Sequence, residues 1–384
     1  MNWQKFSRCI LLASIGINIC CYFLGAYVFG ISILNQPGVL NDFYGAFIPA
    51  VHRFLDNPAT LYEFSILPFR NFPEIVYYFM LFYPITSQNY LNLLACSSVI
   101  LLFNLVCCHV IMKITSMKEF DATGLPISFK LTPILLAAYL LTPMQPIEYM
   151  NGQVNVITNA FLLLAIYYMF KKNEKLAFFF FGCAAAFKIT ILLLIPFFLF
   201  VDIRSNLVKK LLFRAFFLVV PFIPSIVLFL IIPGLPTSFF QLNLAMTETM
   251  NPLFATGNCS LTKFLATVFN RNIIVTFVVT AASIYGISAC VLLKYHVSLI
   301  ERSMLGVFSM ILIMPDFYGL HFLFIFGIAI LWLLTRWEVH GVVYRLAFLV
   351  ITTSFFLWYF NPLASVNFLT ISSALGFFEV IIAR

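Results

Sequence analysis

Charge is scarce in this chain. Only 9% of its 384 residues are Asp, Glu, Lys or Arg, whereas 62% are hydrophobic. A soluble domain has about 25% charged and about 45–50% apolar residues, so soluble globular and disordered classes are excluded. The net charge of +8 does not indicate a nucleic-acid partner, because the Lys and Arg residues stand in short clusters between long apolar runs. An integral membrane protein is the class that remains.

Three further features are missing. Polar and apolar residues do not alternate with a period of two, which argues against a membrane β-barrel, and the 47 Phe residues favour packed helices. The nine Cys residues show no CxxC or Cys/His metal spacing, so we interpret them as packing residues and expect no metal or cofactor. No small-residue cleavage site follows the first apolar run, which we therefore interpret as a retained span.

Long apolar runs dominate what is present. A helix needs roughly 20 apolar residues to cross the hydrocarbon core, and the sequence predicts an all-α polytopic protein with about twelve such helices. Two of the connections between them, 32–72 and 234–271, are long enough to hold a site. The predicted spans are 9–31, 73–87, 90–112, 131–147, 154–170, 176–201, 215–233, 272–294, 299–314, 319–335, 342–360 and 363–382.

Lys and Arg residues in short loops predict the orientation, because they gather on the cytoplasmic side. With twelve spans, both long connections face the outside. One group does not fit: Lys171, Lys172 and Lys175 would also lie outside, unless 73–87 or 176–201 is a re-entrant hairpin. The residues that would lie inside are Lys5, Arg8, Arg204, Lys209, Lys210, Arg214, Arg302, Arg336, Arg345 and Arg384.

The first long connection contains an acidic residue followed by an amphipathic stretch. Apolar residues recur at helical spacing after Asp42 and run beside Arg53 until Pro58, which predicts a helix in the membrane interface. A carboxylate at this boundary is partly desolvated, and its raised pKa suits a general base. The alternative is that Asp42 is only the N-cap of the helix, and the local sequence favours this alternative.

Polar residues also interrupt two of the predicted spans. Gln153 and Asn155 open span 154–170, where they could bind a substrate or join helices by hydrogen bonds. Lys188 lies midway along 176–201, and a buried cation there costs about 2.5–3.5 kcal/mol. It could hold a lipid phosphate, pair with Glu148, or extend to the interface.

The outer side contributes further candidates. Asn258 and Lys263 lie in the second long connection, where a substrate contact and a plain surface loop are equally compatible with the sequence. Asp316 and His321 join two later spans on the side predicted for Asp42. His titrates near neutral pH, so His321 could act as a base or donate to a phosphate oxygen.

Taken in order, these residues resemble a known family. The chain is similar to GT-C membrane glycosyltransferases, and in particular to glycosyltransferase family 87, the polyprenol-phosphate-mannose-dependent α-mannosyltransferases. The match extends over roughly residues 40–200, while Ile191 stands where the family has Pro and His321 lacks the family's neighbouring His and Trp residues. The matching segments are Asp42-Phe43-Tyr44, Leu61-Tyr62 with Phe72-Pro73, Gly152-Gln153-Val154-Asn155, and Gly182 to Lys188.

The resemblance implies a GT-C fold with a seven-span catalytic module, 1–271, and a five-span helical region, 272–384. It implies an inverting hexosyltransferase, probable mannose donor included, that takes a polyprenyl-phosphate sugar and a glycolipid or glycan acceptor. The protein would be a multi-pass protein of the cell or inner membrane, in contact with membrane lipids and with an extracytoplasmic site. The implied catalytic residues are Asp42 and His321, and the implied substrate-binding residues are Tyr44, Arg53, Arg70, Gln153, Asn155, Lys188, Asn258, Lys263 and Asp316.

Two other classes share the multi-span layout. A transporter or flippase of lipid-linked sugars usually has internal repeats, and the sequence contains no convincing repeat. An O-antigen polymerase or ligase has Arg-rich outer loops, whereas the second long connection has only Lys263 and Arg271. Both remain alternatives to the glycosyltransferase.

Overall fold

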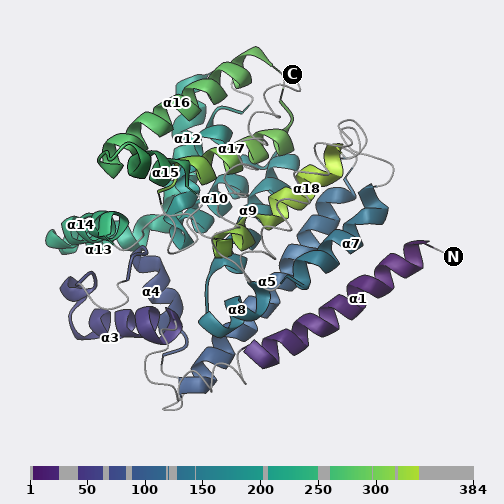
Figure 1. Ribbon diagram of the computed structural model, residues 1–384, viewed down its shortest axis with the longest axis horizontal. Helices are drawn as coiled ribbons and strands as arrows, with labels where there is room; N and C mark the ends of the chain where they lie inside the picture. Colours follow the sequence, from purple (N-terminus) through teal and green to yellow (C-terminus); the bar gives the residue numbers. More distant parts are fainter. Residues whose placement is uncertain are drawn as a thin grey trace. The chain divides into compact units, whose positions relative to one another are not determined.

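A computed structural model describes most of the chain, and every element in the part it describes is helical (Figure 1). The predicted spans 342–360 and 363–382 lie outside the described residues. These residues are 3–25, 42–63, 69–83, 89–117, 120, 128–142, 144–201, 206–249, 260–295, 297–315 and 319–336.

The chain divides into two compact units, each assembled from separated stretches. The first unit comprises 1–110, 133–189 and 213–245. Its main elements are α1 (Trp3–Tyr22), η2 (Phe43–Phe47), α3 (Ile48–Asp56), η3 (Pro58–Thr60), α4 (Pro73–Met80), α5 (Asn89–Thr115), α7 (Ser128–Leu140), α8 (Met144–Asn151), α9 (Asn155–Phe170), α10 (Glu174–Phe187), α12 (Leu207–Val219), η5 (Val220–Phe222), α13 (Ile223–Ile231) and α14 (Gly234–Thr249).

The second unit comprises 111–132, 190–212 and 246–384. Helices α5, α7, α12 and α14 therefore contribute residues to both units. The other elements of the second unit are η4 (Ile189–Leu193), α11 (Pro196–Leu199), α15 (Leu261–Val268), α16 (Ile273–Lys294), α17 (Leu299–Ile313), η6 (Gly319–Phe324) and α18 (Phe326–Arg336).

Several of these helices are long and apolar enough to span a membrane, so the protein is a helical membrane protein with more than one candidate span. Four continuous helical segments in the described residues meet this condition, and the bent pair α8–α9 makes a fifth. The expectation of about twelve spans is therefore not met in the described residues. The four segments are Lys5–Gly25, Leu91–Thr115, Leu207–Ile231 and Ile273–Lys294.

Breaks in the helices explain the difference. The predicted span 73–87 contains α4, which is only eight residues long, and the predicted span 176–201 is interrupted at Lys188, where the backbone is extended. Apolar composition alone does not reveal such breaks, because a window of hydrophobic residues is counted alike whether or not its backbone bonds are continuous.

A buried polar network joins helices of the first unit. The Tyr149 hydroxyl donates to Asn18 Oδ1 over 2.7 Å and accepts from Asn104 Nδ2 over 2.8 Å. Asn104 also exchanges hydrogen bonds with Gln145 and accepts from the Tyr139 hydroxyl. These side chains are the interhelical link between α1, α5, α7 and α8, a role that the sequence had also offered for Gln153 and Asn155.

Candidate functional site

Asp42 stands at the start of the helical stretch formed by η2 and α3. It occupies the N-cap position, as the cap interpretation requires, but its side chain makes no capping hydrogen bond. Its Oδ2 atom accepts a hydrogen bond from Nε2 of Gln153, 111 residues further along the chain. The carboxylate is therefore directed at the turn between α8 and α9 and does not cap its own helix.

The helix that follows agrees with the sequence. Helix α3 buries Ala50 and Val51 and exposes His52 and Asp56, which gives it the predicted amphipathic character. It ends at Asp56, and Pro58 begins a separate 3-10 turn. Pro cannot donate the backbone hydrogen bond that would continue the helix, which explains the position of this end.

Gly152 makes the turn at Gln153 possible. Helices α8 and α9 are bent by 110° relative to each other, and Gly152 between them has a positive φ of 57°. A side chain there would also place its Cβ atom 2.7 Å from Cδ2 of Phe43. Glycine avoids both the backbone strain and the overlap, so the residue next to Asp42 can pack against the turn that carries Gln153.

Glu148 holds the beginning of α9. Its Oε1 atom accepts from the backbone N–H groups of Asn155 and Val156 over 2.7 and 3.1 Å, and its Oε2 atom accepts from Asn155 Nδ2 over 2.9 Å. The first N–H groups of a helix have no partner inside it, and a carboxylate at this end also complements the helix dipole. Glu148 is fully buried, so this clamp fixes the α8–α9 turn from inside the unit.

Lys188 follows the last residue of α10, and its backbone is extended with φ −141° and ψ 105°. Its charge interacts with those of both Glu148 and Asp42. Lys188 was predicted midway along a continuous span, but it stands where the helix breaks. The break brings the cation into the same cluster as the two carboxylates.

Two arginines add positive charge in the first unit. Arg70 is half-buried, donates from Nε to Asn243 Oδ1 over 3.3 Å, and interacts electrostatically with Lys188. Arg53 on α3 is half-buried, and its Nε and Nη2 atoms are buried without a hydrogen-bond partner among the described residues. Burial lowers the pKa of Arg53, and the charge of Glu63 partly offsets this effect. Buried donors without partners are costly, which makes Arg53 a candidate for binding an anion.

The surroundings of Asp42 oppose its ionisation on balance. Burial raises the pKa of Asp42 above its ordinary value, while the positive charge of Lys188 and the hydrogen bond from Gln153 lower it by less. A carboxyl group with a raised pKa accepts a proton more readily near neutral pH than an exposed one does. The geometry therefore combines a basic carboxylate with nearby cations.

The remaining predicted residues are distributed over the molecule. Tyr44 is half-buried beside Asp42 in η2, and its ring meets the edge of Phe43 at 4.9 Å. Lys263 on α15 is 8% exposed, and His321 is half-buried in η6; both belong to the second unit and are not part of the Asp42 cluster of the first. Asn258 and Asp316 lie outside the described residues.

The site residue that sequence reasoning underrated is Glu148, which had been considered only as a structural partner of Lys188. The available signal was its isolation: it is the only acidic residue between Asp121 and Glu174. A carboxylate in such an apolar region is costly unless other groups bind it. The three hydrogen bonds to α9 could not be read from the sequence, because they depend on the bend at Gly152.

Comparison with models of known protein families and with curated proteins found no match for this chain. Among the described residues, no group of three or more His, Cys, Asp or Glu side chains could hold a metal ion. The candidate site is therefore characterised by its own residues, chiefly Asp42, Gln153, Glu148, Lys188 and Arg70.

Proposed function

We propose that the protein is a membrane glycosyltransferase that moves a hexose from a polyprenyl-phosphate sugar to a hydroxyl of a glycolipid or glycan. The observation that carries this proposal is the half-buried Asp42 carboxylate, held by Gln153 beside the charge of Lys188. The resemblance of the same residues to family 87 favours mannose as the sugar and a GT-C arrangement of about twelve helices. It also favours a site on the extracytoplasmic side of a cell or inner membrane.

The proposed reaction uses Asp42 as a general base. Its carboxylate takes the proton of the acceptor hydroxyl, and the acceptor oxygen forms a bond to the anomeric carbon of the sugar. The bond between that carbon and the phosphate oxygen breaks, and the lipid phosphate leaves with the electron pair. Attack on the face opposite to the leaving group inverts the configuration at this carbon.

A phosphate that leaves with additional negative charge requires positive groups nearby. Lys188 and Arg70 interact electrostatically with each other, although like charges repel, and an anion between them would relieve this repulsion. Arg53 has buried donors that a phosphate oxygen could accept from. We therefore assign these three residues to the donor phosphate, with Gln153 and Asn155 as parts of the wall of the site.

Substitution of Asp42 tests the proposal. Membranes that contain the protein would be incubated with a panel of polyprenyl-phosphate sugars, and the glycolipid products identified by mass spectrometry. Asp42→Asn should lower transfer by a factor of about 10² or more, because general-base catalysis contributes about 10²–10⁴-fold. Asp56→Asn is the matched control, since Asp56 is exposed at the other end of the same helical stretch.

Two outcomes would contradict the proposal. Unchanged transfer by Asp42→Asn would remove Asp42 from the role of base. Movement of a lipid-linked sugar across the membrane without a new glycosidic product would favour the transporter or flippase, and transfer only from diphosphate-linked oligosaccharides would favour the polymerase or ligase.

A further inference from the structure

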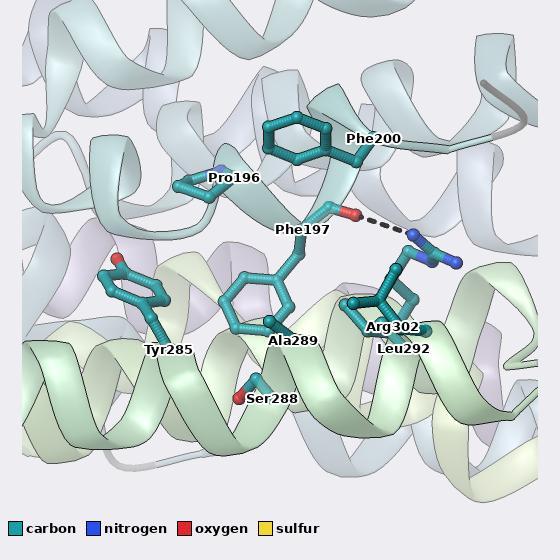
Figure 2. Close-up of a pocket in the computed structure, with 9 residues that line it drawn as sticks. Pro196, Phe197, Phe200, Tyr285, Ser288, Ala289, Leu292 and Arg302 are labelled. Carbon is teal, nitrogen blue, oxygen red and sulfur yellow. Dashed lines mark hydrogen bonds between the residues drawn. The ribbon is translucent and has the colours of Figure 1, made fainter.

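The second unit contains a pocket of about 410 Å³ that the proposed transfer reaction does not use. Helix α16 forms one wall, and the short segment around α11 together with the first turn of α17 forms the other (Figure 2). Its lining includes Phe197, Phe200, Tyr285, Ser288, Leu292 and Arg302.

Specific contacts hold the walls of this pocket together. The Tyr285 hydroxyl donates to the carbonyl oxygen of Leu193 over 2.7 Å, which ties α16 to η4. Nη1 of Arg302 donates to the carbonyl oxygen of Phe197 over 3.4 Å (Figure 2). A Cβ atom at Gly306 would lie 3.1 Å from Phe197 Cδ2, so the glycine allows α11 to approach α17 closely. The pocket is therefore preformed by the packing of the unit.

The lining is apolar except at a few points. From Tyr285 to Leu293, α16 presents two turns to the pocket, a length of about 12 Å at 1.5 Å per residue. Ser288 is 1% exposed, and its Oγ atom has no hydrogen-bond partner among the described residues. An elongated apolar chain with a hydrogen-bond acceptor at one position would complement both features.

The position of the cation identifies the kind of chain. Helix α16 is a candidate membrane span that ends at Lys294, and Arg302 lies just beyond it in α17. A basic residue at the end of a span is at the level of the lipid headgroups. The nearby Glu301 carboxylate accepts from the backbone N–H of Ser298 in a capping box. The planar guanidinium group of Arg302 can therefore meet a phosphate.

We propose that this pocket binds an anionic phospholipid, with one acyl chain along α16 and the phosphate against Arg302. Ser288 Oγ would donate to an ester carbonyl oxygen of the same lipid. The distribution of Lys and Arg in the sequence predicts that Arg302 lies on the inner side of the membrane, opposite to Asp42. The ligand is therefore a lipid of the inner leaflet and not the sugar donor of the proposed reaction.

Lipid binding to the purified full-length protein tests this proposal. Native mass spectrometry would compare phosphatidylglycerol, phosphatidylcholine and a polyprenyl phosphate, each titrated separately. We expect the wild-type protein to bind phosphatidylglycerol most tightly, and Arg302→Gln to weaken that binding about tenfold or more, the effect of one lost charged hydrogen bond. Ala289→Trp, which would fill the pocket and retain Arg302, should weaken phosphatidylglycerol and phosphatidylcholine binding alike.

Arg271→Gln is the matched control, because Arg271 is an exposed cation just before the opposite end of α16, and it should bind phosphatidylglycerol as the wild type does. Unchanged phosphatidylglycerol binding by both pocket variants would overturn the proposal. A preference for polyprenyl phosphate, or equal binding of the anionic and zwitterionic phospholipids, would also overturn it. Asp42→Asn should bind phosphatidylglycerol normally, so failure of the glycosyltransferase proposal would leave this result unaffected.

Discussion

At the scale of single residues, Asp42 is placed where burial and charge act against each other. Burial raises the pKa of this carboxyl group, while Lys188 and Gln153 favour the charged form. A base that is fully neutralised by a salt bridge would have little tendency to take a proton, and an isolated buried carboxyl group would remain protonated. The observed combination suits a base that works near neutral pH.

The same balance predicts how stability depends on pH. Because the pKa of Asp42 is raised in the folded protein, the unfolded chain loses this proton first, near the ordinary value of 3.8. The folded state binds more protons between that value and the raised pKa, so the free energy of unfolding falls as pH rises through this window. Thermal unfolding in detergent across this pH range should show that Asp42→Asn lacks this part of the decline. An identical pH profile for the two proteins would contradict the raised pKa.

Glu148 and Lys188 provide a prediction about stability. Glu148→Gln removes the negative charge that faces Lys188 and weakens the clamp on α9. We expect it to lower the free energy of unfolding by about 2–3 kcal/mol, because it leaves a buried cation with less compensation. Lys188→Met in the same chain should restore part of this loss. Denaturant unfolding of both single variants and the double variant measures the coupling, and additive losses would show that the two charges do not interact.

At the scale of elements, the sequence predicted well those helices whose hydrogen bonding is uninterrupted. The spans predicted at 90–112 and 272–294 are confirmed as α5 and α16, with ends that differ by at most three residues. The breaks after Phe187 and at the α8–α9 bend were not predicted. Each break depends on contacts with distant residues, such as Phe43 against Gly152, and local hydrophobicity does not encode such contacts.

The α8–α9 turn therefore deserves a test of its own. Gly152→Ala would require a side chain at a positive φ and within 2.7 Å of Phe43. We expect this substitution to cost about 1–3 kcal/mol of stability and to reduce sugar transfer at least tenfold, since Phe43 adjoins Asp42. Gly234→Ala is the control, because no heavy atom lies within 4 Å of the added methyl group. Equal transfer rates for Gly152→Ala and the wild type would show that the turn does not position Asp42.

At the scale of the whole molecule, an ion pair constrains the topology. Arg214 is 1% exposed and donates from Nη2 to Glu174 Oε1 over 2.8 Å and from Nε to Oε2 over 3.0 Å. Glu174 follows the turn that contains Lys171 and Lys172, and Arg214 lies in the first half of the candidate span Leu207–Ile231. Both groups must therefore lie toward the same side of the membrane. The twelve-span count put them on opposite sides, so it cannot be correct at this point.

The broken elements remove the conflict. If α4, with eight residues, and the interrupted segment 176–201 do not cross the membrane, four crossings precede Lys171, and the same number precedes Lys209. The turn at Lys171 then joins the other Lys and Arg clusters on the inner side, as the positive-inside rule requires. Helix α9 would run from the outer side at Gln153 to the inner side at Lys171. Helix α10 would return toward Asp42, where Lys188 is found.

Labelling with a membrane-impermeant maleimide tests this topology. Single cysteines would be introduced as His52→Cys, Lys172→Cys and Lys209→Cys, three exposed positions, and the labelling of the parent chain with its nine cysteines would be subtracted. In intact cells we expect reaction only at position 52, because α3 precedes the outer end of α4 and α5. Positions 172 and 209 should react only after the membrane is permeabilised, since Glu174 and Arg214 hold the elements that carry them at one level. Labelling of position 172 but not 209 from outside would contradict the ion pair and restore the predicted crossing at 176–201.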